Sequence, residues 1–280
     1  MKVFISGDIE GVTGLVSWSQ CGRPNSDHYD FAFARERYTA DINAAIRGAK
    51  KAGATEVVVK DSHGNSKNLL ISDLEPGTRL ISGHGAGFGG MMNGINREFT
   101  AAMLIGYHAM AGTPNAIMEH TITGYLHRMW INDIETGEIG LSAGLAGCFE
   151  VPIVTVSSDR AGCDEARRVN PKVSTAIVKE SYGRYMGECL HPSETADLIE
   201  EAARKGVEAA SDMDPYVFEL PITVRIEFNR SEEATAAARL IGVRRLDGYT
   251  VEYEAESYAL AHQAAWNMIQ TADLGHSADR

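Results

Sequence analysis

Short apolar runs that end abruptly in polar side chains recur along this chain, and they constrain its fold more than any other feature. Three such runs, over residues 2–7, 55–60 and 101–107, are followed by Asp8 and Glu10, by His63 and by His108. The second run contains three consecutive valines, a pattern typical of parallel strands that are buried on both faces. Because the carboxyl ends of parallel strands share one edge of a sheet, where ligands bind, we expect these side chains to lie together.

The segments between the runs have helical periodicity. From Phe31 to Ala52 the residues Tyr38, Ile42, Ala45 and Ile46 recur at the spacing of a buried helix face, and Gly53 follows as a typical helix end. Strand and helix patterns alternate in this way through most of the chain. The sequence therefore predicts an α/β fold with a mostly parallel central sheet flanked by helices.

The second half of the chain contains further elements and one candidate linker. We expect a long loop over 112–125 and then alternating strands and helices over 128–132, 138–149, 152–157, 159–168, 172–179 and 193–210. The helix at 138–149 is rich in Gly and Ala, so it can lie close to a neighbour. Residues 211–215 are the best candidate for a linker. A linker there divides the chain into a larger α/β unit at 1–211 and a small β-α-β-α unit at 216–280. The smaller unit consists of an alternating stretch from Tyr216 to Phe228, a helix at 232–240, a strand at 250–254 and a helix at 258–271.

Composition excludes several classes of protein. With 44% hydrophobic and 23% charged residues, the 280-residue chain is of ordinary globular composition. A formal net charge of −12 argues against a nucleic-acid partner, because phosphate binding depends on Lys and Arg. No apolar run approaches the roughly 18 residues of a membrane span. The first residues reach a charge too early for a signal peptide, so we expect a cytoplasmic protein with no membrane partner.

The polar side chains at the strand ends suit a metal site. Asp8 and Glu10 are two residues apart on an extended segment, so both carboxylates can reach one cation. Glu138, which opens the Gly/Ala-rich helix, adds a third carboxylate to the imidazoles of His63 and His108. Nitrogen and oxygen ligands together favour zinc or a similar divalent metal. Taken singly, each residue also fits a simpler role, such as an acidic turn, a surface histidine or a helix N-terminal carboxylate.

His120 lies in the irregular loop and is a candidate general acid or base, since histidine titrates near neutral pH. An exposed loop histidine is the simpler alternative. The glycine-rich stretch from His84 to Gly90 lacks the Lys-Ser/Thr ending of a phosphate-binding loop. The chain also has no Gly-x-Ser-x-Gly nucleophile motif, so serine hydrolysis has no support.

With these residues in place, the chain resembles the bacterial zinc D-aminopeptidases, the decameric metallopeptidases associated with dipeptide transport. The resemblance covers most of the chain and rests on an ordered set of stretches: 6–11, 61–63, 80–83, 106–109, 118–121, 131–133 and 137–140. It implies two zinc ions held by Asp8, Glu10, His63, His108 and Glu138, with His120 as the catalytic histidine. It also implies release of N-terminal D-amino acids from short peptides through a metal-activated water, and a ring-like homo-oligomer, a decamer.

The chain departs from the family pattern at the pocket. Glu119 precedes His120 where D-specific members carry a small polar residue, and the loops at 18–29 and 83–90 also differ. The metal chemistry therefore transfers more directly than the substrate preference. Two alternatives remain open at this stage: a dimetal hydrolase of another amide or a phosphoester, and a metal-containing binding protein without catalysis.

Overall fold

The computed structural model describes residues 1–21, 30–85 and 89–277, whose strands form two sheets. The strands are β1 (Lys2–Gly7), β2 (Glu56–Asp61), β3 (Thr78–Ile81), β4 (Ala101–Ile105), β5 (Leu126–Ile131), β6 (Ile134–Glu135), β7 (Ile153–Asp159), β8 (Ser174–Gly183), β9 (Met186–Cys189), β10 (Ile222–Phe228), β11 (Arg244–Arg245) and β12 (Thr250–Ala255). The α-helices are α1 (Trp18–Cys21), α2 (Phe31–Lys51), α3 (Glu138–Gly147), α4 (Arg160–Val169), α5 (Pro192–Glu208), α6 (Ser231–Ala237) and α7 (Tyr258–His276).

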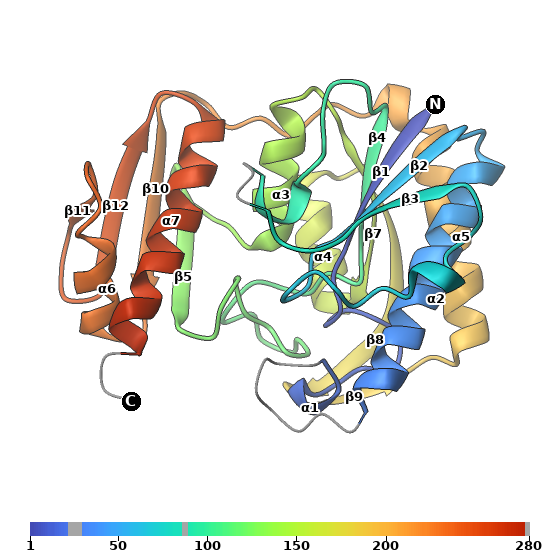
Figure 1. Cartoon of the computed structure of the whole chain (residues 1–280), viewed down its shortest axis with the longest axis horizontal. Helices are drawn as coiled ribbons and strands as arrows, with labels where there is room; N and C mark the ends of the chain where they lie inside the picture. Colours follow the sequence, from blue (N-terminus) through green and yellow to red (C-terminus); the bar gives the residue numbers. More distant parts are fainter. Residues whose placement is uncertain (22–29, 86–88, 278–280) are drawn as a thin grey trace.

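The larger sheet has seven strands in the order β3-β2-β1-β4-β7-β8-β9 (Figure 1). Every neighbouring pair is parallel except β8 and β9, which form an antiparallel hairpin. Side chains alternate between its faces, so Val3 and Ile5 join the core beneath α2 and α5, while Phe4 joins the core on the opposite face. The prediction of an α/β fold with a mostly parallel sheet flanked by helices is confirmed.

Helix α2 agrees with its predicted bounds to within one residue. Tyr38, Ile42, Ala45 and Ile46 are fully buried, as their spacing indicated. Gly53, two residues beyond the helix, adopts a φ of +91°, the left-handed conformation that glycine takes readily after a helix.

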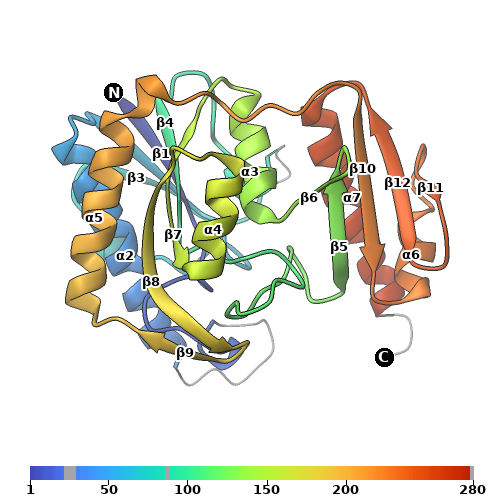
Figure 2. The same ribbon diagram turned by 180° about the vertical axis from the view of Figure 1, so that it is seen from behind.

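The second sheet has the order β11-β12-β10-β5-β6 and lies beside the first (Figure 2). Its two strands β5 and β6 come from residues 126–135, well before the predicted linker. They belong to this sheet because β5 pairs antiparallel with β10, with Ile131 opposite Val224. The smaller unit is thus completed by a hairpin from the first part of the chain, and the division into residues 1–211 and 216–280 stays a prediction.

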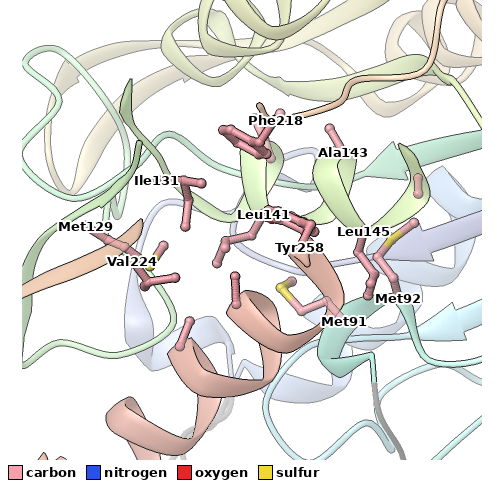
Figure 3. Packing of buried hydrophobic residues seen from close by; sticks show 14 of the residues in the cluster. Met91, Met92, Met129, Ile131, Leu141, Ala143, Leu145, Phe218, Val224 and Tyr258 are labelled. Carbon is pink, nitrogen blue, oxygen red and sulfur yellow. The ribbon is translucent and has the colours of Figure 1, made fainter. Parts of the chain in front are cut away.

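A continuous apolar core joins the two sheets. Figure 3 shows side chains of β5, β10, α3 and α7 meeting there, among them Ile131, Val224, Leu141 and Tyr258. The small residues of α3 permit this close packing, since a Cβ at Gly144 would lie 2.4 Å from the Tyr258 ring. The Gly/Ala composition of this helix is therefore a packing requirement.

Several elements differ from their predicted bounds, and β8 is displaced to 174–183 from the predicted 172–179. The strand expected over Tyr216–Phe228 begins only at Ile222, directly after Pro221, which has no N–H for the ladder. Helix α7 continues five residues past the predicted end at Thr271, because His276 pairs with Glu233 at 2.7 Å. Strand β9 was not predicted. In the described part of the chain no helix is long and apolar enough to cross a membrane.

Candidate metal centre

The side chains at the ends of β1, β2 and β4 lie together at the carboxyl edge of the larger sheet. Asp8 Oδ1 is 3.2 Å from His63 Nδ1, and Asp8 Oδ2 is 3.4 Å from His108 Nε2. Glu10 Oε2 lies 3.1 Å from the same His63 nitrogen, and Glu138 Oε1 lies 3.3 Å from His108 Nε2. The structure thus brings all five predicted ligand residues to one place, with Asp8 between the two imidazoles.

Two close approaches of the backbone make this convergence possible. Gly11 donates from its N–H to the carbonyl of Gly106 at 2.7 Å, and a Cβ at Gly11 would lie 1.8 Å from the Tyr107 carbonyl. Gly106 has a φ of +74°, and a Cβ there would lie 2.3 Å from the carbonyl of Asp8. Only glycine fits both positions, so the loop after β1 can pack directly on the end of β4.

Each imidazole has one nitrogen bound to a backbone carbonyl and the other directed at the carboxylates. His63 Nε2 contacts the Cys21 carbonyl at 2.9 Å, and His108 Nδ1 contacts the Ala109 carbonyl at 3.0 Å. His120 Nδ1 likewise contacts the Met118 carbonyl at 3.0 Å. A carbonyl can only accept, so these contacts place the N–H there and leave the lone pair of the inner nitrogen for a metal or a proton. This arrangement is frequent around metal-bound histidine.

The electrostatics of the cluster call for added positive charge. Burial would raise the pKa of Asp8, but His108 and His63 together hold it well below its ordinary value. Burial likewise acts against the charged forms of the two histidines, yet Glu10 and Asp8 raise the pKa of His63, and Glu138 and Asp8 raise that of His108, well above the ordinary value. Burial raises the pKa of Glu138. Three buried carboxylates therefore face only two imidazoles that can carry positive charge, and divalent cations would supply the charge that is missing.

The ligand atoms also suit a metal because some of them are buried without a hydrogen bond. Glu10 Oε2 and His108 Nε2 are buried, and their ion-pair contacts at 3.1–3.4 Å do not have hydrogen-bond geometry to any described residue. Buried polar atoms are nearly always hydrogen-bonded, so both require another partner. The potential ligand atoms form two groups, and within each group all of them lie within 4.8 Å of one another. One group consists of Asp8, Glu10 and His108, and the other of His108, His120 and Glu138. Mixed imidazole and carboxylate groups of this kind suit zinc.

His120 lies at the rim of the cluster. Its ring stacks on His108 with centroids 4.0 Å apart, and its Nε2 is 3.7 Å from Glu138 Oε1. Burial and the neighbouring His108 lower the pKa of His120 well below its ordinary value, so this imidazole is neutral. The sequence pointed to a role as acid or base, and the geometry also makes His120 a possible ligand.

Two side chains pack around the His120 segment: Trp18 of the loop expected at the pocket, and Arg184, which was not predicted. The Trp18 ring packs edge-on against the His120 ring, with centroids 5.0 Å apart. Arg184, in the turn between β8 and β9, donates to the Glu119 carbonyl at 2.8 Å and pairs with the Glu119 carboxylate, also at 2.8 Å. Glu119, beside His120, is therefore held in place by Arg184. The sequence around Glu119 does not indicate this partner.

Two further acidic residues, Glu165 and Asp61, form hydrogen bonds with segments that adjoin the site. Glu165 of α4 accepts a hydrogen bond from the Met110 N–H at 2.7 Å, and burial raises its pKa to about 7. The sequence could have pointed to Glu165, because it is a charged residue on the buried face of a helix. Asp61 accepts from Asn68, whose side chain in turn donates to the His63 carbonyl at 2.8 Å, so it orders the loop of His63 and not its ring. The two loops expected to line the pocket include residues 22–29 and 86–88, which lie outside the described part of the chain.

Comparisons with known proteins agree with this geometry. A family model described as D-aminopeptidase matches residues 1–267. The D-aminopeptidase of Bacillus subtilis (strain 168) is 32% identical over 275 residues, which is 97% of this chain and 98% of that protein. The solved structure of the Zn-dependent D-aminopeptidase DppA from Bacillus subtilis, a self-compartmentalizing protease, is similar with a TM-score of 0.93 at 31% identity, covering 98% of both chains.

Proposed function

The chain belongs to the D-aminopeptidase family, and on that premise we propose that it is a zinc-dependent aminopeptidase that releases N-terminal D-amino acids from short peptides. The observation that carries the proposal is the convergence of Asp8, Glu10, His63, His108 and Glu138 at one sheet edge. The zinc dependence of the similar solved structure supports the choice of metal.

We assign two zinc ions to the site. Asp8 directs one carboxylate oxygen to His63 and the other to His108, which suits a carboxylate shared by two ions. Glu10 and His63 would complete one position, and His108 with Glu138 the other. When bound, a pair of such ions lowers the pKa of a water molecule and polarises the scissile carbonyl.

His120 would move the proton in this reaction. Its Nδ1 contacts the Met118 carbonyl, so Nε2 carries the lone pair and can accept a proton from the attacking water. The same nitrogen would then deliver that proton to the leaving amine. Burial and the neighbouring His108 lower the pKa of His120, so the imidazole is neutral before the reaction begins, which is the protonation state that an acceptor needs.

The proposed assembly rests on the family resemblance and on the similar solved structure. DppA is a self-compartmentalizing protease. We propose that this chain also forms a closed homo-oligomer, a decamer as the family resemblance implies, and we keep the cytoplasmic location as an expectation. Mass measurement by light scattering tests the assembly. A monomer in solution at working concentration would contradict it.

The test of function is hydrolysis of paired dipeptides with D-Ala or L-Ala at the N-terminus, with and without chelator. We expect cleavage of the D-peptide that is lost on chelation and restored by zinc. Asp8→Ala serves as the inactive control, because it removes the shared carboxylate. Chelator-sensitive cleavage of L-peptides alone would overturn the stereochemical assignment, and stoichiometric zinc without cleavage of either peptide would overturn the peptidase assignment.

A further inference from the structure

Lys179 is a buried cation that the proposed reaction does not use. It lies on β8 directly after the apolar run Ala176-Ile177-Val178, paired with Asp159 of β7 on one side and Cys189 of β9 on the other. Its relative exposure is 1%, so its ammonium group is removed from water. A buried charge is costly unless it is fully hydrogen-bonded, and its partners therefore indicate its role.

All three partners of the Lys179 ammonium belong to the loop after β1. Nζ donates to the carbonyls of Glu10 at 2.6 Å, Val12 at 3.0 Å and Leu15 at 2.5 Å. An ammonium group has three N–H donors, so these bonds use all of them. Burial lowers the pKa of Lys179, and the nearby carboxylate of Asp159 opposes this effect.

The N–H groups of the same loop are held from other directions. Gly11 donates to the Gly106 carbonyl at 2.7 Å, and Thr13 donates to Asp41 Oδ2 at 2.9 Å. The loop is therefore fixed on both sides of its backbone: its amides by Gly106 and Asp41, and its carbonyls by Lys179. Without the ammonium, the carbonyls of Glu10 and Leu15 would lose their donor and that of Val12 would keep only the Leu15 N–H at 3.3 Å, and unpaired buried carbonyls are strongly avoided.

The bonds from Lys179 to the 10–15 loop affect the Glu10–His63 side of the candidate metal centre more than the His108–Glu138 side. The carbonyl held by Lys179 and the carboxylate that faces His63 belong to the same residue, Glu10. Asp8 is fixed independently, because its N–H donates to the Ile105 carbonyl at 2.8 Å. Glu138 lies on α3 and does not belong to this loop.

We propose that Lys179 is a positioning residue for Glu10: its ammonium gathers the carbonyls of the 10–15 loop and thereby sets the Glu10 carboxylate opposite His63. The inference rests on the proposed two-zinc function and adds to it. Loss of Lys179 should weaken the zinc position formed by Glu10 and His63 and leave the position formed by His108 and Glu138 almost unchanged.

The test compares Lys179→Met and Lys179→Gln with Val178→Ala by zinc titration against a competing chelator. Val178 is equally buried on the same strand, and its apolar side chain has no donor for the carbonyls of the loop, so its variant controls for general destabilisation. We expect one of the two zinc ions to bind at least 10-fold more weakly in both Lys179 variants and the other to change less than 2-fold. Gln keeps two N–H donors in a neutral group, so the Lys179→Gln variant carries the test by itself if Lys179→Met does not fold.

A second measurement does not depend on metal. Hydrogen exchange of the zinc-free proteins should accelerate in peptides spanning residues 8–16 in the Lys179 variants, with exchange in 101–107 unchanged, and wild-type amides in 10–15 should be protected. Equal zinc affinities in the Lys179 and Val178 variants, or wild-type exchange in 10–15 as rapid as in a free loop, would overturn the inference alone. Wild-type protein that binds no zinc would overturn the proposed function, and the inference with it.

Discussion

Gly106 provides the sharpest test of how the backbone brings the site together. Its φ is +74°, and a Cβ added there would lie 2.3 Å from the Asp8 carbonyl, so alanine meets two obstacles at this position. The left-handed conformation costs an L-residue about 1–2 kcal/mol. Carbon and carbonyl oxygen approach to about 3.3 Å, so the Asp8 loop must also move by roughly 1 Å from the end of β4. Such overpacking costs about 1–3 kcal/mol more.

Gly77 offers a matched control. Its φ is +81°, and a Cβ there would meet nothing within 4 Å. Gly77→Ala should therefore lose only the conformational part, about 1–2 kcal/mol, whereas Gly106→Ala should lose about 2–5 kcal/mol. Urea unfolding of the two zinc-free variants and the wild type measures both values.

The same displacement should affect metal binding. Asp8 Oδ2 and His108 Nε2 are 3.4 Å apart, on the two loops that Gly106→Ala would separate. Metal–ligand distances tolerate about 0.2 Å, so a shift near 1 Å should weaken zinc binding more than 10-fold by chelator competition. Equal stability and equal zinc affinity of the Gly106→Ala and Gly77→Ala proteins would refute this reasoning.

Three other substitutions test individual roles. His120→Gln should keep its zinc and lose about 100-fold or more in kcat, as for a general acid–base group; loss of zinc on metal analysis would instead make His120 a ligand. The pKa of Glu165 is raised from 4.5 to about 7, so the folded protein loses stability as pH rises through that interval. Urea unfolding of the zinc-free proteins should therefore show Glu165→Gln equal in stability to wild type below pH 4.5. At pH 8 the variant should be more stable by up to about 3 kcal/mol. Equal stability at pH 8 would contradict this. Arg184→Met removes the bonds to Glu119 and should lower kcat about 10-fold, while stability changes by less than about 1 kcal/mol and zinc content stays constant. Arg160→Met, which breaks an exposed pair outside the site, is its control and should leave kcat unaltered.

The parts of this protein that could be predicted from sequence are those that depend on local patterns. The buried face of α2 follows from its periodicity, and the strand ends at Asp8, His63 and His108 follow from apolar runs that stop at polar residues. A local pattern does not contain the partners of a distant segment. Arg184 and Glu119 are 65 residues apart, and β5 finds β10 about ninety residues further along the chain. Both contacts arise from packing of the whole molecule, so neither could be predicted.

The location of Asp8 between two imidazoles depends on the order of strands and on no local pattern. β1 lies between β2 and β4, with Gly7 opposite Asp61 on one side and Ile105 on the other. Neighbouring strands are about 4.8 Å apart, so residues just beyond β2 and β4 are separated by about 10 Å, and a side chain from the middle strand faces both. If β2 were the middle strand, the same motifs would reach the same edge, but His63 would be central. The strand ends therefore predict that the site lies at the carboxyl edge of the sheet. The order of the strands determines that Asp8 is the carboxylate that two ions can share. For this reason Asp8→Ala should remove both zinc ions, whereas Glu138→Gln should remove one.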